Sequence, residues 1–239
     1  MEPKLDNLAI IRGAMAEQGY PESQQLSSVA RGLYANAPNF KGTTGKTALM
    51  YAAYIGALGR VQQLLDKGTN VNNVDVNGFN ALAYAAMGEK SIHESNPDHS
   101  AVIRLLLKTG TNLEAQNNLG QTPLNIAAYN GNVEAVQILC AAGANTNTVD
   151  YDNQTPFLAL LYRFINMPDK IPIQNVKDIL SILLTHGMAR EYAKSVVNNF
   201  VVGDLKTELL RIINQQNGSS RMVRRRKTRR IKKIRKSRS

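Results

Sequence analysis

Residues 42–47 are the stretch whose residue types come nearest to a chemical site. They read GTTGKT, which is similar to the glycine-rich loop whose backbone N–H groups and lysine hold the phosphates of a nucleotide. That loop has four residues between its glycines, whereas two separate Gly42 from Gly45, and Phe40 stands where the first glycine would be. No apolar strand pattern precedes the stretch either. We therefore expect no nucleotide and no other cofactor.

Histidines and a cysteine are the next candidates for chemistry. His93 and His99 lie six residues apart with Glu94 and Asp98 between them, but this spacing fits no common pattern of metal ligands. We predict a solvated polar loop there and no metal site. Cys140 lies within an apolar helical pattern, which is typical of a small buried side chain rather than a reactive thiol.

Residue pairs that could perform catalysis do not occur at usable spacings. The chain shows no nucleophile beside a base and no pair of acids arranged for proton transfer. We therefore predict no catalytic residues and no enzymatic activity. The alternative is an enzyme whose site assembles from the terminal segments or from insertions, because catalytic residues distant in sequence can meet in a fold.

The excess positive charge is confined to the C-terminal end. Residues 221–239 hold twelve Lys or Arg residues and no acid. Removing these twelve from the 29 Lys and Arg residues of the chain leaves 17, against 18 Asp and Glu residues. The rest of the chain is therefore almost neutral, and the basic segment is an appended electrostatic element.

Three kinds of partner suit this basic segment. Its density of lysine and arginine is typical of a nuclear localisation signal, which an import receptor reads, and equally of sequence-independent contact with the phosphates of RNA or DNA. An anionic membrane surface or an acidic protein is the third alternative. The residues predicted for targeting or nucleic-acid contact are Arg224, Arg225, Arg226, Lys227, Arg229, Arg230, Lys232, Lys233, Arg235 and Lys236.

The middle of the chain holds four copies of one two-helix pattern, which begin at residues 45, 78, 120 and 153. In the third copy, GQTPLNIAAYNGNVEAVQILCAAG, Thr122 can cap a helix, Pro123 suits its first position, and Gly131 permits a turn into a second helix. Helices this short cannot bury their apolar faces alone, so neighbouring copies must stack. The second and fourth copies carry insertions between their helices. The insertion of the fourth copy, residues 166–173, contains two prolines and is expected to be ordered.

Residues 122–127 (TPLNIA) and 155–160 (TPFLAL) share a recognisable signature. With it the chain resembles the ankyrin repeat family, whose pattern is T-P-L-H-x-A at a period near 33 residues. The resemblance implies that the hydrogen-bond donor usual at the histidine position is absent from every repeat of this chain. That position is held by Met50, Ala83, Asn125 and Leu158.

The resemblance implies an all-α fold, an ankyrin-repeat solenoid of about four helix-turn-helix repeats with short β-turn tips. The terminal units of a solenoid must tolerate water on one face, so we expect helical caps at both ends, followed by a disordered, flexible basic tail. The predicted divisions are an N-terminal cap at 1–41, the repeats over 42–188 (42–74, 75–116, 117–149 and 150–188), a C-terminal cap at 189–216 and the basic tail at 217–239.

The resemblance also implies where a partner binds, namely on a concave surface formed by the turn tips and the exposed face of the first helices. One column of that surface is predicted to hold Tyr54, Met87, Tyr129 and Tyr162, and large, rigid aromatic side chains are enriched at interface hot spots. The alternative is that the tyrosines pack over the groove with their hydroxyls in water. The predicted turn tips add Val76, Asn77, Phe79, Asn118, Leu119, Tyr151 and Asp152.

The sequence therefore predicts a monomeric, non-enzymatic adaptor that binds a protein partner on its concave surface, with the tail directing or tethering the pair. The alternative is a non-specific nucleic-acid-binding protein whose main functional element is the tail. A single cysteine and no signal-like N-terminus indicate an intracellular protein, cytoplasmic or nuclear. No apolar run approaches the roughly 20 residues that span a bilayer. Delivery into a host cell stays open, by analogy with ankyrin proteins of intracellular bacteria and large viruses.

Overall fold

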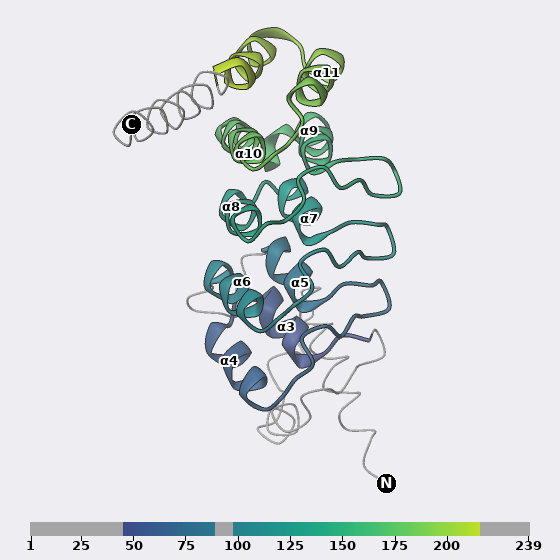
Figure 1. Cartoon of the computed structure of the whole chain (residues 1–239), viewed down its shortest axis with the longest axis vertical. Helices are drawn as coiled ribbons and strands as arrows, with labels where there is room; N and C mark the ends of the chain where they lie inside the picture. The colour runs from purple at the N-terminus through teal and green to yellow at the C-terminus, as the bar shows by residue number, and fades with distance from the viewer. Residues whose placement is uncertain (1–44, 89–97, 216–239) are drawn as a thin grey trace, which may run out of the picture.

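The computed structural model describes residues 45–88 and 98–215, which form a single stack of paired helices (Figure 1). The first helix of each pair belongs to one layer and the second helix to the other. The first layer consists of α3 (Ala48–Tyr54), α5 (Ala81–Met87), α7 (Pro123–Tyr129) and α9 (Pro156–Asn166). The second layer consists of α4 (Leu58–Asp66), α6 (His99–Lys108), α8 (Val133–Ala141) and α10 (Ile173–Thr185). The predicted all-α repeat solenoid is confirmed.

Threonine and asparagine side chains start the first-layer helices. Thr47, Asn80, Thr122 and Thr155 each accept a hydrogen bond from the backbone N–H three residues later, at 2.8–3.3 Å. This bond satisfies one of the donors that a helix start leaves open. Proline follows both Thr122 and Thr155, at a position where its missing N–H costs nothing. The capping role predicted for Thr122 is confirmed.

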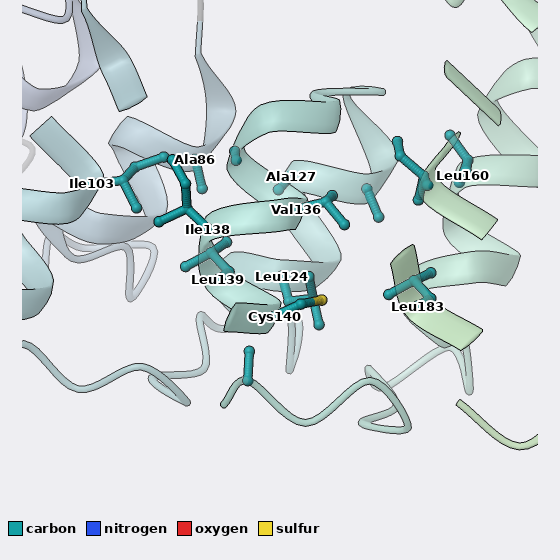
Figure 2. Packing of buried hydrophobic residues seen from close by; sticks show 14 of the residues in the cluster. Ala86, Ile103, Leu124, Ala127, Val136, Ile138, Leu139, Cys140, Leu160 and Leu183 are labelled. Atoms are coloured by element: carbon teal, nitrogen blue, oxygen red, sulfur yellow. The ribbon is translucent and has the colours of Figure 1, made fainter. Parts of the chain in front are cut away.

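The apolar core lies between the two layers and runs from pair to pair (Figure 2). In the first layer, small residues such as Ala86 and Ala127 are fully buried, so that neighbouring helices approach closely and larger side chains such as Leu139 fill the space behind them. Cys140 is 3% exposed, as predicted for a buried residue. Burial raises the pKa of its thiol to about 12, so the thiol stays protonated and unreactive near neutral pH.

Asn125 corrects the expectation that every repeat lacks a hydrogen-bond donor at the histidine position. Its Nδ2 donates to the backbone oxygen of Gln154 in the next repeat at 3.2 Å, and its Oδ1 accepts from the hydroxyl of Thr122 at 2.6 Å. A side-chain amide carries both a donor and an acceptor. Asparagine therefore links the start of its own helix to the following turn.

The insertion of the second repeat is only partly described, because residues 89–97, with His93 and Glu94, lie outside the described ranges. The prediction that His99 lies in a solvated loop is wrong. His99 is the first residue of α6 and is partly buried, and Asp98 caps that helix by accepting from the N–H of Ala101 at 2.8 Å. The residue therefore belongs to the packed stack.

The insertion of the fourth repeat forms a short 3-10 helix, η2 (Pro168–Lys170), as expected for an ordered segment. Ile171, which follows it, is 2% exposed and lies against Gly131 of the preceding pair. A β-carbon on Gly131 would lie 2.8 Å from Cγ2 of Ile171. Asn175 adds a hydrogen bond from Nδ2 to the backbone oxygen of Gly131 at 2.9 Å. The insertion and the start of α10 therefore pack against and hydrogen-bond to the preceding repeat.

The end of the stack is a helix pair without a preceding turn tip. α11 (Arg190–Phe200) follows α10, and a further helix covers residues 203–215 (Figure 1). Leu209 and Ile213 of this last helix are fully buried, and Glu208 forms an ion pair of 2.7 Å with Lys177 on α10. The predicted N-terminal cap and the basic residues of the tail lie outside the described ranges.

Candidate protein-interaction surface

The side chains of the predicted column, which we call the first-layer column, occupy equivalent positions on four helices. Tyr54, Met87 and Tyr129 end α3, α5 and α7 and are partly buried. Tyr162, on the longer α9, is 55% exposed. The structure therefore places the four residues in one layer, and Tyr162 is the most exposed of them.

Tyr54 belongs to an aromatic cluster that sequence reasoning did not anticipate. It stands edge-on to Tyr84, with ring centroids 5.9 Å apart, and Phe79 lies 5.6 Å from Tyr84. The ammonium of Lys46 lies over both tyrosines, 4.9 Å from the ring centroid of Tyr84 and 5.7 Å from that of Tyr54. The Tyr84 hydroxyl donates to Oδ2 of Asp75 at 2.7 Å, so the cluster ties α5 to a turn tip. The sequence could have indicated this role of Tyr84, because Tyr84 precedes Met87 by three residues and therefore lies one helical turn from the predicted column.

Tyr129 also has a cation over its ring, supplied by the next repeat. The guanidinium carbon of Arg163 lies 4.6 Å from the ring centroid, and Nη1 donates to Oδ1 of Asn130 at 3.1 Å. Such stacking is favourable because the ring face is electron-rich. Sequence reasoning did not assign Arg163 to the surface, although it is the one charged residue within the first-layer helices.

The turn tips, residues 75–79, 117–121 and 150–154, share one hydrogen-bond pattern. Oδ1 of Asp75, Asn117 or Asp150 accepts from the backbone N–H groups two and four residues later, at 2.8–3.0 Å. This pattern fixes each tip and leaves its outermost side chains in solvent. The exposed fractions are 59% for Val76, 59% for Leu119 and 72% for Tyr151; Asn77, Asn118 and Asp152 are also exposed, and Phe79 is partly buried.

Successive turn tips bond to one another. The backbone N–H of Asn118 donates to the oxygen of Asn77 at 2.9 Å, and its Nδ2 donates to the oxygen of Val76 at 2.9 Å. The N–H of Tyr151 donates to the oxygen of Leu119 at 3.0 Å. These bonds join the tips into one edge beside the first layer (Figure 1), and a pre-ordered surface loses less entropy when a partner binds.

The environment of the His99 imidazole should make the stability of the fold depend on pH. Its Nε2 donates to the backbone oxygen of Tyr54 at 2.8 Å. Burial lowers the pKa of the ring below 6.5, and the smaller effect of the negative charge of Asp98 is to raise that pKa. The unfolded chain therefore takes up this proton at a higher pH than the folded chain does. We expect the free energy of unfolding to fall as the pH drops below 6.5.

Urea unfolding at a series of pH values measures this effect, with His99→Gln as the comparison. The variant should lose part of the fall in stability on the acid side, because glutamine does not titrate. Equal pH dependence in the natural chain and the variant would contradict the assignment.

Two further findings bear on the kind of site. Within residues 45–88 and 98–215, His, Cys, Asp and Glu do not gather in groups of three or more that could hold a metal ion. Across the same ranges, no helix has the length and apolar character that crossing a membrane requires.

Comparison with known proteins agrees with the repeat architecture. A family model described as ankyrin repeats (3 copies) matches residues 15–95 and 93–163, and so begins inside the segment predicted as the N-terminal cap. The putative ankyrin repeat protein R664 of Acanthamoeba polyphaga mimivirus is 29% identical over 129 residues, 51% of this chain and 77% of that protein.

Two enzymes are similar over a part of their length. Tyrosine-protein kinase HTK16 of Hydra vulgaris is 26% identical over 172 residues, 70% of this chain and 22% of that protein. Glycerophosphocholine phosphodiesterase gde1 of Schizosaccharomyces pombe is 32% identical over 116 residues, 48% of this chain and 9% of that protein. The chain thus spans less than a quarter of either enzyme.

Proposed function

The chain belongs to the ankyrin repeat family, whose repeats are non-catalytic protein-interaction modules, and from this premise we propose that it is a non-enzymatic adaptor. Its partner is a protein that binds the concave surface, made of the first-layer column and the turn tips. The observation that carries the proposal is the exposure of large apolar side chains along this surface, at 55% for Tyr162, 59% for Leu119 and 72% for Tyr151. Exposed apolar side chains that gather on one surface are typical of interaction sites.

The rigidity of the surface supports the same proposal. Hydrogen bonds hold each tip and join it to the next, so a partner meets side chains that are already in place. Tyrosine contributes a large contact area at a small cost in side-chain entropy. Hot spots of this kind carry most of the binding free energy of an interface.

The basic tail has a second role in the proposal. Its twelve Lys and Arg residues direct the bound pair to the nucleus or tether it to RNA or DNA through phosphate contacts. The charge of the tail supports an alternative function as well, in which non-specific nucleic-acid binding by the tail is the main activity and the repeats are a support.

Affinity capture from cell lysate separates these two functions. We would compare the natural chain with a tail variant, in which the twelve Lys and Arg residues of 221–239 are changed to glutamine, and with Tyr162→Ala, each with and without nuclease. We expect a protein partner that survives nuclease and the tail variant but is lost with Tyr162→Ala. The matched control is Phe200→Ala on α11, because Phe200 is also an aromatic residue, 53% exposed, outside the proposed surface.

The opposite result would favour the alternative. If everything captured disappears in the tail variant or after nuclease, and Tyr162→Ala changes nothing, the tail is the functional element and the adaptor proposal fails.

A further inference from the structure

The guanidinium of Arg163 has unused hydrogen-bonding capacity. Nη1 donates to Asn130, while Nε is buried without an acceptor among the described residues. The ion pairs found in those ranges, Lys177 with Glu208 and Lys194 with Glu191, do not include Arg163. The other terminal nitrogen, Nη2, has no partner among the described residues and is not buried. Nη2 is therefore the group through which this arginine can receive an anion from outside.

The stacking of Arg163 on Tyr129 fixes the plane of that guanidinium. The ring lies 4.6 Å from the guanidinium carbon, and the bond to Asn130 holds one end of the fork. A guanidinium held in one plane presents its remaining N–H groups in the geometry that matches a carboxylate. The partial burial of the group also weakens screening by water, so an approaching negative charge is attracted more strongly than at an open surface.

α9, which carries this cation, is longer than its neighbours and adds exposed apolar side chains to the first layer. It has 11 residues, whereas α3, α5 and α7 have 7 each. The additional length carries Ile165, 48% exposed, and ends at Met167, 49% exposed. Tyr162 and Ile165 are three residues apart and share one side of the helix, and Arg163 and Met167, four residues apart, share the adjoining side. We call Tyr162, Arg163, Ile165 and Met167 the α9 patch.

The charges near the α9 patch favour an acidic ligand. α3, α5, α7 and α9 contain no Asp or Glu residue, so the layer that carries the patch does not repel a carboxylate. A second cation, Lys46, lies over the tyrosines at the other end of the first-layer column. Asp169, the acid nearest to the patch in sequence, lies in the separate 3-10 helix η2 and forms no ion pair with Arg163.

We propose that the α9 patch binds an acidic, partly apolar segment of the partner protein. A carboxylate of that segment accepts hydrogen bonds from the Nη2 end of the Arg163 guanidinium, and a neighbouring apolar side chain lies against Tyr162 and Ile165. This inference rests on the proposed function, because it names the chemistry of a partner that binds the same surface. The guanidinium supplies charge specificity and the apolar side chains supply contact area.

Selection from a library of random displayed peptides tests the proposal with the full chain. The library is first depleted on the immobilised Arg163→Gln variant, which carries the same basic tail and so removes peptides that bind the tail. It is then selected on the natural chain. We expect the survivors to share Asp or Glu beside Leu, Ile or an aromatic residue. Survivors without an acidic residue, or no survivors, would overturn the proposal.

A double-mutant cycle on the best selected peptide measures the contact itself. Arg163→Gln in the protein, or the change of the acidic residue to its amide in the peptide, should each weaken binding about 10- to 100-fold. The two changes together should cost little more than one. Independent effects would show that the acid binds elsewhere. Thermal unfolding confirms that the variant is folded, and Arg163→Lys, which keeps the charge without the fork, should restore only part of the affinity.

The two proposals fail in different ways. If Tyr162→Ala abolishes capture of the cellular partner while Arg163→Gln leaves it unchanged, the adaptor function stands and the acidic segment does not. If neither substitution affects capture, both proposals fail.

Discussion

Changing Asn125 to leucine should lower the free energy of unfolding by about 2–4 kcal/mol. Asn125 is 1% exposed. Its side chain accepts a hydrogen bond from the hydroxyl of Thr122 at 2.6 Å and donates one to the backbone oxygen of Gln154 at 3.2 Å. Leucine has the same branched shape and the same number of side-chain heavy atoms but no polar atom, and Leu158 holds the equivalent position in the fourth repeat. The loss therefore comes from the buried polar groups that it leaves without partners.

Urea unfolding gives this difference directly. The control is Asn199→Leu, the same chemical change at an exposed position of α11, where we expect a change within about 0.5 kcal/mol. A loss below about 1 kcal/mol for Asn125→Leu would mean that the network contributes little.

Changing Gly78 to alanine should destabilise the stack by about 2–4 kcal/mol. Gly78 has a φ of +82°, and a β-carbon there would lie 2.9 Å from the Cα of Asn117 and from the backbone N of Asn118. Both atoms belong to the backbone of the next turn tip. That tip would have to move, which would disturb its hydrogen bond to Asn77.

Gly110→Ala is the matched control for this effect. Gly110 has a φ of +79°, and a β-carbon there meets no atom within 4 Å. This variant should lose about 1–2 kcal/mol, the strain of a left-handed backbone alone. Equal losses at the two glycines would show that the tips do not depend on each other.

The features that local sequence patterns encode could be predicted. A capping threonine or asparagine, glycine at turns and the helical period recur among the copies, because each acts within a few residues of its own position. Four copies of the pattern were enough to predict the solenoid, and the family match agrees with it.

The features that depend on contacts between repeats could not be predicted. His99 bonds to the oxygen of Tyr54, 45 residues away, although its surroundings in sequence are typical of a polar loop. Arg163 stacks on Tyr129 of the preceding repeat, and nothing in the local pattern specifies which ring it meets. Asn125 was misjudged for a different reason, because comparison with the histidine of the family pattern hid the fact that an amide also donates.

The central claim is that the partner lies against the first layer and not the second. We would replace Tyr162 with the photo-crosslinking residue p-benzoylphenylalanine in the full chain, and would place the same residue at Arg104, which is exposed on α6 of the second layer. After illumination in cell lysate, position 162 should crosslink to one protein and position 104 should not. Crosslinking of that protein from position 104 alone would contradict the account.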